Sequence, residues 1–139
     1  GLPPAQDIDG EAAKHWQQNT NSPGYYSNCS ADQSYAVEAM QMAGATSVQI
    51  VKGWFNETLS GTKIEPRIAL LRLDADWYES TMDCLANLYD NVVPGGVIIM
   101  DDYYAWDGCA RAVHDFLSRR NLPDRVMQWN NAVCYIVKK

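Results

Sequence analysis

Two short apolar runs, each ending in aspartates, constrain the fold of this chain most. Residues 68–73 read IALLRL and lead into Asp74-Ala75-Asp76, and residues 97–100 read VIIM and lead into Asp101-Asp102. Such runs are typical of strands buried on both faces of a parallel sheet. The carboxylates that follow them would lie at the carboxyl edge of the sheet, where open α/β sheets bind ligands.

The spacing of the acids predicts a metal site. Asp74 and Asp101 are separated by about one strand–helix–strand unit, so their strands should be neighbours, about 4.8 Å apart. With Asp102, three carboxylates would offer the oxygen ligands that Mg²⁺ prefers, and the absence of nearby histidine and cysteine disfavours zinc. The alternative is that these acids cap helices or solvate a loop, but adjacent carboxylates repel unless a cation or protons intervene.

Composition narrows the class of protein. The 139 residues are enough for one domain with a core, and a net charge of −6 opposes binding to nucleic acid. No apolar run approaches the roughly 20 residues that span a membrane. The four cysteines are widely spaced, which is typical of reduced thiols, so we expect a cytoplasmic location.

Strands and helices alternate along the chain. This alternation predicts an α/β fold with a largely parallel sheet, helices on its faces and a terminal antiparallel hairpin, in a single domain over residues 1–139. The expected elements are an irregular, lid-like segment over 1–30 with a short helix near 11–18; a helix from Ser30 to about Ala43; a strand at 47–51; a short helix at 56–60; a loop between Gly61 and Pro66; the strands at 68–73 and 97–100, each followed by a helix; and a hairpin of 125–129 with 133–137.

Polar residues are expected at the helix starts. Ser30 and Gln33 have the spacing of a capping box, and so do Asp76 and Glu79. Asp107 is expected to cap the helix that follows it. In the helix after Ser30, the spacing of Tyr35, Ala39 and Ala43 predicts a buried stripe.

Aromatic residues accompany the predicted strand ends. Gly53 would allow a close approach of the backbone to a ligand, and Trp54 and Phe55 could cover a flat heteroaromatic ring, although core packing is the simpler interpretation. Tyr103 directly follows the second acidic pair and could line an acceptor pocket, or its ring could fold onto the sheet.

Two further polar residues need an interpretation. By strand alternation Arg72 shares a face with Asp74 and could pair with an acid of the cluster. His114 is a lone histidine within a helical pattern, and we expect it to be inert.

Three segments of this sequence resemble the macrocin-type O-methyltransferase family. They are residues 52–59 (KGWFNETL), 71–81 (LRLDADWYEST) and 94–103 (PGGVIIMDDY), and the resemblance covers nearly the whole chain. It implies a Rossmann-like class I methyltransferase fold and an enzyme of natural product biosynthesis that uses S-adenosylmethionine and Mg²⁺. The acceptor would be a hydroxyl of a sugar or of another diol-bearing small molecule, with no nucleic acid or membrane as partner.

The resemblance also implies roles for individual residues. Mg²⁺ would be held by Asp74, Asp101 and Asp102, and Asp74 would also be the general base and lie at the cofactor. Gly53 and Trp54 would lie near the adenine end of the cofactor together with Phe55, and Tyr103 would contact the acceptor.

The chain departs from the family pattern at its start. The glycine-rich turn after a first strand, and a second strand ending in a ribose-binding acid, are not found, and the chain begins at Gly1 without methionine or signal peptide. We therefore expect the C-terminal part of a longer protein, lacking the first two strands and binding the cofactor poorly. The strand at 68–73 would have a bare apolar edge, which favours aggregation or a homo-oligomer.

Two alternatives to an active methyltransferase stay open. One is an inert fragment or pseudoenzyme with a vestigial metal site. The other is a different Mg²⁺-dependent α/β enzyme, such as a phosphotransferase, although no glycine-rich loop that could cradle phosphate is found.

Overall fold

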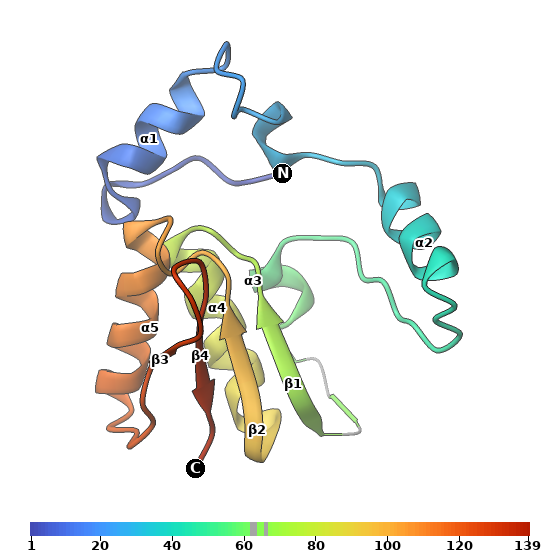
Figure 1. Cartoon of the computed structure of the whole chain (residues 1–139), viewed down its shortest axis with the longest axis vertical. Helices are drawn as coiled ribbons and strands as arrows, with labels where there is room; N and C mark the ends of the chain where they lie inside the picture. The colour runs from blue at the N-terminus through green and yellow to red at the C-terminus, as the bar shows by residue number, and fades with distance from the viewer. Residues whose placement is uncertain (62–63, 66) are drawn as a thin grey trace.

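The computed structural model describes residues 1–61, 64–65 and 67–139. Part of the expected loop between Gly61 and Pro66 therefore lies outside the described residues. Four strands form one mixed sheet in the order β1-β2-β4-β3 (Figure 1). The strands are β1 (Ile68–Leu73), β2 (Val92–Met100), β3 (Met127–Gln128) and β4 (Cys134–Val137).

The direction of the strands agrees only in part with the predicted sheet. β1 and β2 are parallel, β4 runs antiparallel to β2, and β3 pairs antiparallel with β4. The α/β class and the terminal hairpin are confirmed. The described sheet is mixed rather than largely parallel, because β1 and β2 form its single parallel pair among the described residues.

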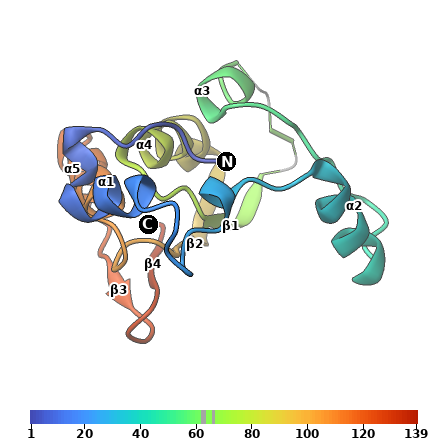
Figure 2. The same cartoon turned by 90° about the horizontal axis from the view of Figure 1, so that it is seen from above.

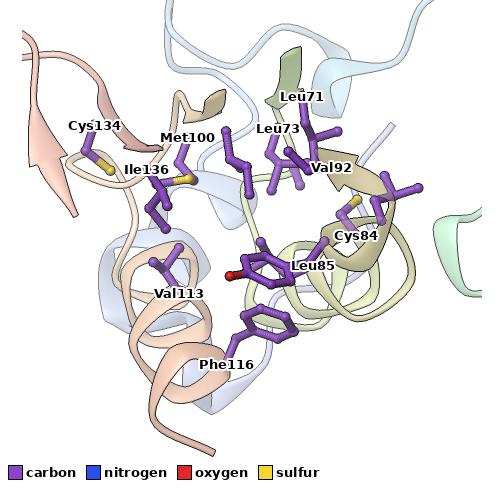
Figure 3. Close-up of a cluster of buried hydrophobic side chains, with 14 residues drawn as sticks. Leu71, Leu73, Cys84, Leu85, Val92, Met100, Val113, Phe116, Cys134 and Ile136 are labelled. Carbon is purple, nitrogen blue, oxygen red and sulfur yellow. The ribbon is translucent and has the colours of Figure 1, made fainter. Parts of the chain in front are cut away.

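Two helices cover one face of this sheet. Figure 2 shows α4 (Tyr78–Leu88) and α5 (Asp107–Arg119) on the same side, and a short 3₁₀ helix, η3 (Tyr89–Asn91), continues α4. Strand side chains alternate between faces, so Leu71 and Leu73 point toward the helices while Leu70 and Arg72 point away. The core lies between the sheet and these helices (Figure 3); it includes Leu71, Leu73, Leu85, Val92, Met100, Val113, Phe116 and Ile136.

The N-terminal segment lies over the carboxyl ends of β1 and β2 in Figure 1. It contains two 3₁₀ helices, η1 (Asp7–Asp9) and η2 (Ser27–Cys29), and one helix, α1 (Glu11–Gln18), which confirms the short helix expected there. Trp16 of α1 makes edge-type contacts with Trp77 and Trp106, at centroid distances of 6.3 and 5.9 Å. These rings attach the segment to the sheet-and-helix layer.

The segment between the N-terminal region and β1 differs from the prediction. Residues 47–51 form no strand, and Val48 and Val51 are exposed. A strand needs a neighbour to accept and donate its backbone hydrogen bonds, and this segment has no sheet partner among the described residues. The short helix that follows, α3, spans Phe55–Thr58.

Helix α2 (Gln33–Met42) also differs from the prediction. Asp32 caps it, with its Oδ1 accepting from the Ser34 backbone N–H at 2.9 Å, so the expected capping box of Ser30 and Gln33 is wrong. The predicted buried stripe is wrong as well, because no residue of α2 is buried and Tyr35 is 67% exposed. Figure 1 shows why: α2 projects away from the sheet, so its apolar side chains have no surface to cover.

The two caps predicted for α4 and α5 do not form. Trp77 and Trp106 occupy the cap positions, and neither helix has a side-chain cap there. Asp107 is the first residue of α5 rather than its cap. No helix in the described part of the chain combines the length and apolar character needed to cross a bilayer.

Candidate metal and cofactor site

Four aspartates gather at the carboxyl ends of β1 and β2. The parallel register pairs Leu73 with Met100, which brings the residues that follow them, Asp74 and Asp101, to the same edge. One carboxylate oxygen each from Asp74, Asp76 and Asp102 lies within 4.8 Å of the other two. Three such oxygens suit a hard divalent cation, so the donor set fits Mg²⁺.

The structure separates Asp101 from this trio. Its Oδ2 accepts from Nη2 of Arg72, and the same Nη2 lies 3.0 Å from Oδ2 of Asp74. Of the three predicted ligands, Asp74 and Asp102 therefore lie together in the trio, while Asp101 is paired with Arg72, which also contacts Asp74.

Asp76 is the member of the site that the sequence analysis assigned to a different role. Its backbone adopts a φ of +53°, its Oδ1 accepts from Nε1 of Trp106 at 3.0 Å, and its N–H donates to Oδ2 of Asp102 at 3.2 Å. The expected role as a cap of α4 is wrong, because its carboxylate points toward Trp106 and Asp102. The signal available in the sequence was that Asp76 follows Asp74 by two residues just after the predicted strand; its positive φ is not visible in that pattern.

Burial and mutual repulsion raise the proton affinity of this site. Burial raises the pKa of Asp76 to about 6, helped by the negative charges of Asp102 and Asp74 and opposed by the hydrogen bond from Trp106. Burial also raises the pKa of Asp102, against the hydrogen bond from the Asp76 backbone. A divalent cation among these groups would favour their ionised forms.

A cavity of about 430 Å³ adjoins the acids. Trp54 and Phe55 border it and are 50% and 39% exposed, so neither ring belongs to the core. The described residues that line it are Gly1, Leu2, Pro3, Cys29, Gly53, Trp54, Phe55, Asp74, Ala75, Asp76 and Ser80. The residues predicted for the cofactor thus share one cavity with two of the acids.

Position 53, which borders the cavity, needs a glycine because the local packing leaves no room for a side chain. Its φ is +150°, and a Cβ there would lie 2.6 Å from Cγ2 of Thr58. Any larger residue would have to move the Thr58 side chain of α3 and would be strained at this φ.

Tyr103 is directed toward α5. Its hydroxyl is hydrogen-bonded to Nε2 of His114 at 2.7 Å, and its ring meets Tyr104 edge-on at 4.9 Å. The described lining of the cavity does not include Tyr103. His114, expected to be a lone residue, has an aromatic partner.

Comparison with known proteins decides the family. Residues 6–138 match the family described as macrocin O-methyltransferase (TylF). The chain belongs to this family. Over 81 residues it is 46% identical to the 8-demethyl-8-(2,3-dimethoxy-α-L-rhamnosyl)-tetracenomycin-C 4'-O-methyltransferase of Streptomyces olivaceus, covering 58% of this chain and 30% of that protein. Over 81 residues it is 38% identical to the mycinamicin III 3''-O-methyltransferase of Micromonospora griseorubida, covering 58% and 31%.

Solved structures agree with the family. The O-methyltransferase NovP superposes with a TM-score of 0.81 at 26% identity, covering 100% of this chain and 56% of NovP. The calicheamicin methyltransferase CalS11 shares the fold, with a TM-score of 0.65 and 24% identity over 99% of this chain and 56% of CalS11. The chain therefore spans little more than half of these structures, and the match to NovP lies in the C-terminal half of that enzyme.

Proposed function

We propose that this chain is the metal-binding part of an S-adenosylmethionine- and Mg²⁺-dependent O-methyltransferase that acts on a hydroxyl of a sugar or another diol-bearing small molecule. The observation that supports it most is the trio of Asp74, Asp76 and Asp102 beside a cavity bordered by Trp54 and Phe55. Family membership supplies the reaction type. The name of the Streptomyces olivaceus relative, an O-methyltransferase of a rhamnosyl-bearing tetracenomycin, supports the acceptor class.

The acids would hold Mg²⁺. Asp74, Asp101 and Asp102 are the ligands implied by the family resemblance, and the geometry adds Asp76 as a fourth acid within reach. The metal would lower the pKa of a coordinated hydroxyl and fix its oxygen, and the cofactor would supply an electrophilic methyl group. Gly53, Trp54 and Phe55 would hold the flat adenine ring at the cavity wall.

The chain would also accept the proton of the acceptor hydroxyl. Asp74 is the proposed base, because it lies both in the acidic trio and in the cavity lining. Asp76 is the second candidate for this role, because it also belongs to the trio and to the cavity lining.

Calorimetry with S-adenosylmethionine and MgCl₂ tests the proposal. Wild-type protein should bind Mg²⁺, and the double variant Asp74→Asn, Asp102→Asn should not. A matched control, Asp115→Asn, removes a carboxylate that pairs with Arg119 on α5 and should leave Mg²⁺ binding unchanged. Mg²⁺ binding that survives in the double variant would place the metal elsewhere.

Titration with S-adenosylmethionine distinguishes the proposed methyltransferase part from the inert alternative. Heat on titration of S-adenosylmethionine into the Mg²⁺-loaded protein, lost in Trp54→Ala, supports the proposed cofactor wall. If S-adenosylmethionine does not bind either with or without Mg²⁺, the result would favour the inert fragment or pseudoenzyme. Turnover of a phosphate ester instead would favour a different Mg²⁺-dependent enzyme.

A further inference from the structure

Arg72 is a charged residue inside an apolar strand. It lies between Leu71 and Leu73 of β1, whose side chains are buried against the helices, and its own side chain points to the opposite face. The guanidinium group stays half exposed, with 55% of the side chain accessible. The side chain of Arg72 therefore contributes nothing to the core, and its polar contacts are what distinguish it.

Those contacts are two carboxylates of the acidic site. Nη2 of Arg72 lies 3.0 Å from Oδ2 of Asp74 and also donates to Oδ2 of Asp101. The strand geometry produces this arrangement. Alternation puts Arg72 and Asp74 on one face of β1, and the register of β1 on β2 brings Asp101 alongside.

The other two acids are held differently. Asp76 accepts from the indole N–H of Trp106, and Asp102 accepts from the backbone N–H of Asp76. Both donors are neutral, so they leave the negative charge of the pair in place. Among the described residues, Arg72 is the cation that forms ion pairs with this group of four aspartates.

We propose that Arg72 is a positioning residue that serves as the internal counter-ion of the acidic site and competes with the divalent cation for Asp74 and Asp101. This inference rests on the metal site proposed above. Without metal, four neighbouring carboxylates repel one another, and the single positive charge of the guanidinium, shared between Asp74 and Asp101, reduces this repulsion. When a divalent cation binds, it meets the positive charge of Arg72 and must share or take over carboxylates that Arg72 already holds.

Arginine suits this task better than lysine. Both contacts run through Nη2, whose N–H donors are held in the plane of the guanidinium, and the group keeps its charge at any pH at which the protein is folded. A lysine ammonium could approach one carboxylate closely, but its flexible chain would hold two less firmly. The arrangement makes metal binding weaker and the metal-free protein more stable than a site of bare carboxylates would allow.

Calorimetry with MgCl₂ and thermal unfolding of the full chain test this inference. We expect Arg72→Gln to bind Mg²⁺ roughly threefold to tenfold more tightly than the wild type, because one repelling charge is lost and two carboxylates are freed. Without metal, its melting temperature should fall by about 3–6 °C. Added Mg²⁺ should therefore raise the melting temperature of the variant by more than that of the wild type.

Two further variants sharpen the comparison. Arg72→Lys should bind Mg²⁺ more tightly than the wild type by a smaller factor, and it replaces the glutamine variant if that protein does not fold. Arg119→Gln removes an arginine that pairs with Asp115 in the last turn of α5, and it should leave Mg²⁺ affinity unchanged.

The outcomes are distinct. Mg²⁺ affinity in the Arg72 variants that equals or falls below that of the wild type would overturn the role of Arg72 while leaving the metal site intact. No heat from the wild type or from any variant would contradict the metal site itself, and this inference with it.

Discussion

At the scale of single residues, Asp9 joins distant parts of the chain. Its side chain is 3% exposed; Oδ1 accepts from the Tyr78 backbone N–H at 2.7 Å and Oδ2 from the Gln6 N–H at 2.8 Å. Gly108 lies against it so closely that a Cβ there would be 2.4 Å from Oδ1. Asp9 thus accepts the hydrogen bond of the first backbone N–H of α4, the capping role expected of Asp76. It also packs against the first turn of α5.

Replacing Asp9 should therefore destabilise the protein. Asp9→Ala leaves the Tyr78 and Gln6 N–H groups without their acceptor, and we expect a loss of about 1–3 kcal/mol in the free energy of unfolding. Urea denaturation measures it. Asp7→Ala is the matched control, since Asp7 is exposed and pairs with Lys14 at the surface, and it should leave the free energy of unfolding nearly unchanged. Equal losses in the two variants would contradict the role of Asp9.

The four cysteines should differ in reactivity, because one is exposed and three are buried. Burial raises the thiol pKa of Cys84, Cys109 and Cys134 to about 12 each; burial and the charge of Asp76 also raise the pKa of Cys29, but this thiol is exposed. A thiol reacts as its thiolate, so the three buried groups should stay unreactive at pH 8 and gain reactivity only as the pH approaches 12. Titration with a disulfide reagent at pH 8 should modify Cys29 alone in the native protein and all four cysteines in denaturant. Cys29→Ser should abolish the native reaction, and rapid labelling of a second thiol would contradict the packing.

At the scale of elements, tryptophans connect the N-terminal segment with the acidic site. Trp77 is 1% exposed, packs edge-on against Trp106 at 5.2 Å and donates from Nε1 to the Pro3 carbonyl at 2.9 Å. Trp106 in turn donates to Asp76. Trp16 adds α1 to this group. The segment over residues 1–30, expected to be lid-like, is thus attached through aromatic contacts to the residues that hold Asp76.

Removing Trp16 should loosen this segment selectively. We expect Trp16→Ala to destabilise the attachment of residues 1–30 by about 1–3 kcal/mol, because α1 loses its contacts with Trp77 and Trp106. Hydrogen exchange should accelerate in α1 while β1 and β2 keep their protection. Trp129→Ala is the control, since Trp129 is 76% exposed and lies at the opposite end of the chain. Uniform acceleration across the sheet would contradict a separate attachment.

At the scale of the whole molecule, the sheet has one covered and one open face. α4 and α5 cover one side, while Leu70 on the other is 62% exposed. A second, apolar hollow lies on this open face, lined by Val97, Ile99, Trp129, Val133 and Tyr135. Apolar faces of this kind, and strand edges without partners, favour association with other chains.

The open face should make this chain self-associate, in line with the predicted homo-oligomer. Leu70→Lys places a charge on β1 at the open face and should reduce association, which sedimentation velocity over a range of concentrations measures. Val48→Lys is the control, because Val48 is 46% exposed but lies outside the sheet. A wild-type chain that stays monomeric at all concentrations would contradict this prediction.

The sequence by itself determined the features that depend on residues close together along the chain. Apolar runs that end in aspartates predicted β1, β2 and the acidic edge, and alternation placed Arg72 on the face of Asp74, because side-chain direction follows from local backbone geometry. The resemblance of three segments indicated the family that residues 6–138 confirm.

Only the tertiary structure decided the features that join distant residues. Capping of α4 by Asp9, the pairing of Arg72 with Asp101 and the bond from Trp106 to Asp76 each connect positions far apart in the chain. The strand predicted at 47–51 does not form for a related reason: whether it has a pairing strand also depends on distant residues. Apolar pattern alone does not make a strand or a buried helix face, because each needs a partner surface, and no local signal shows whether one is present.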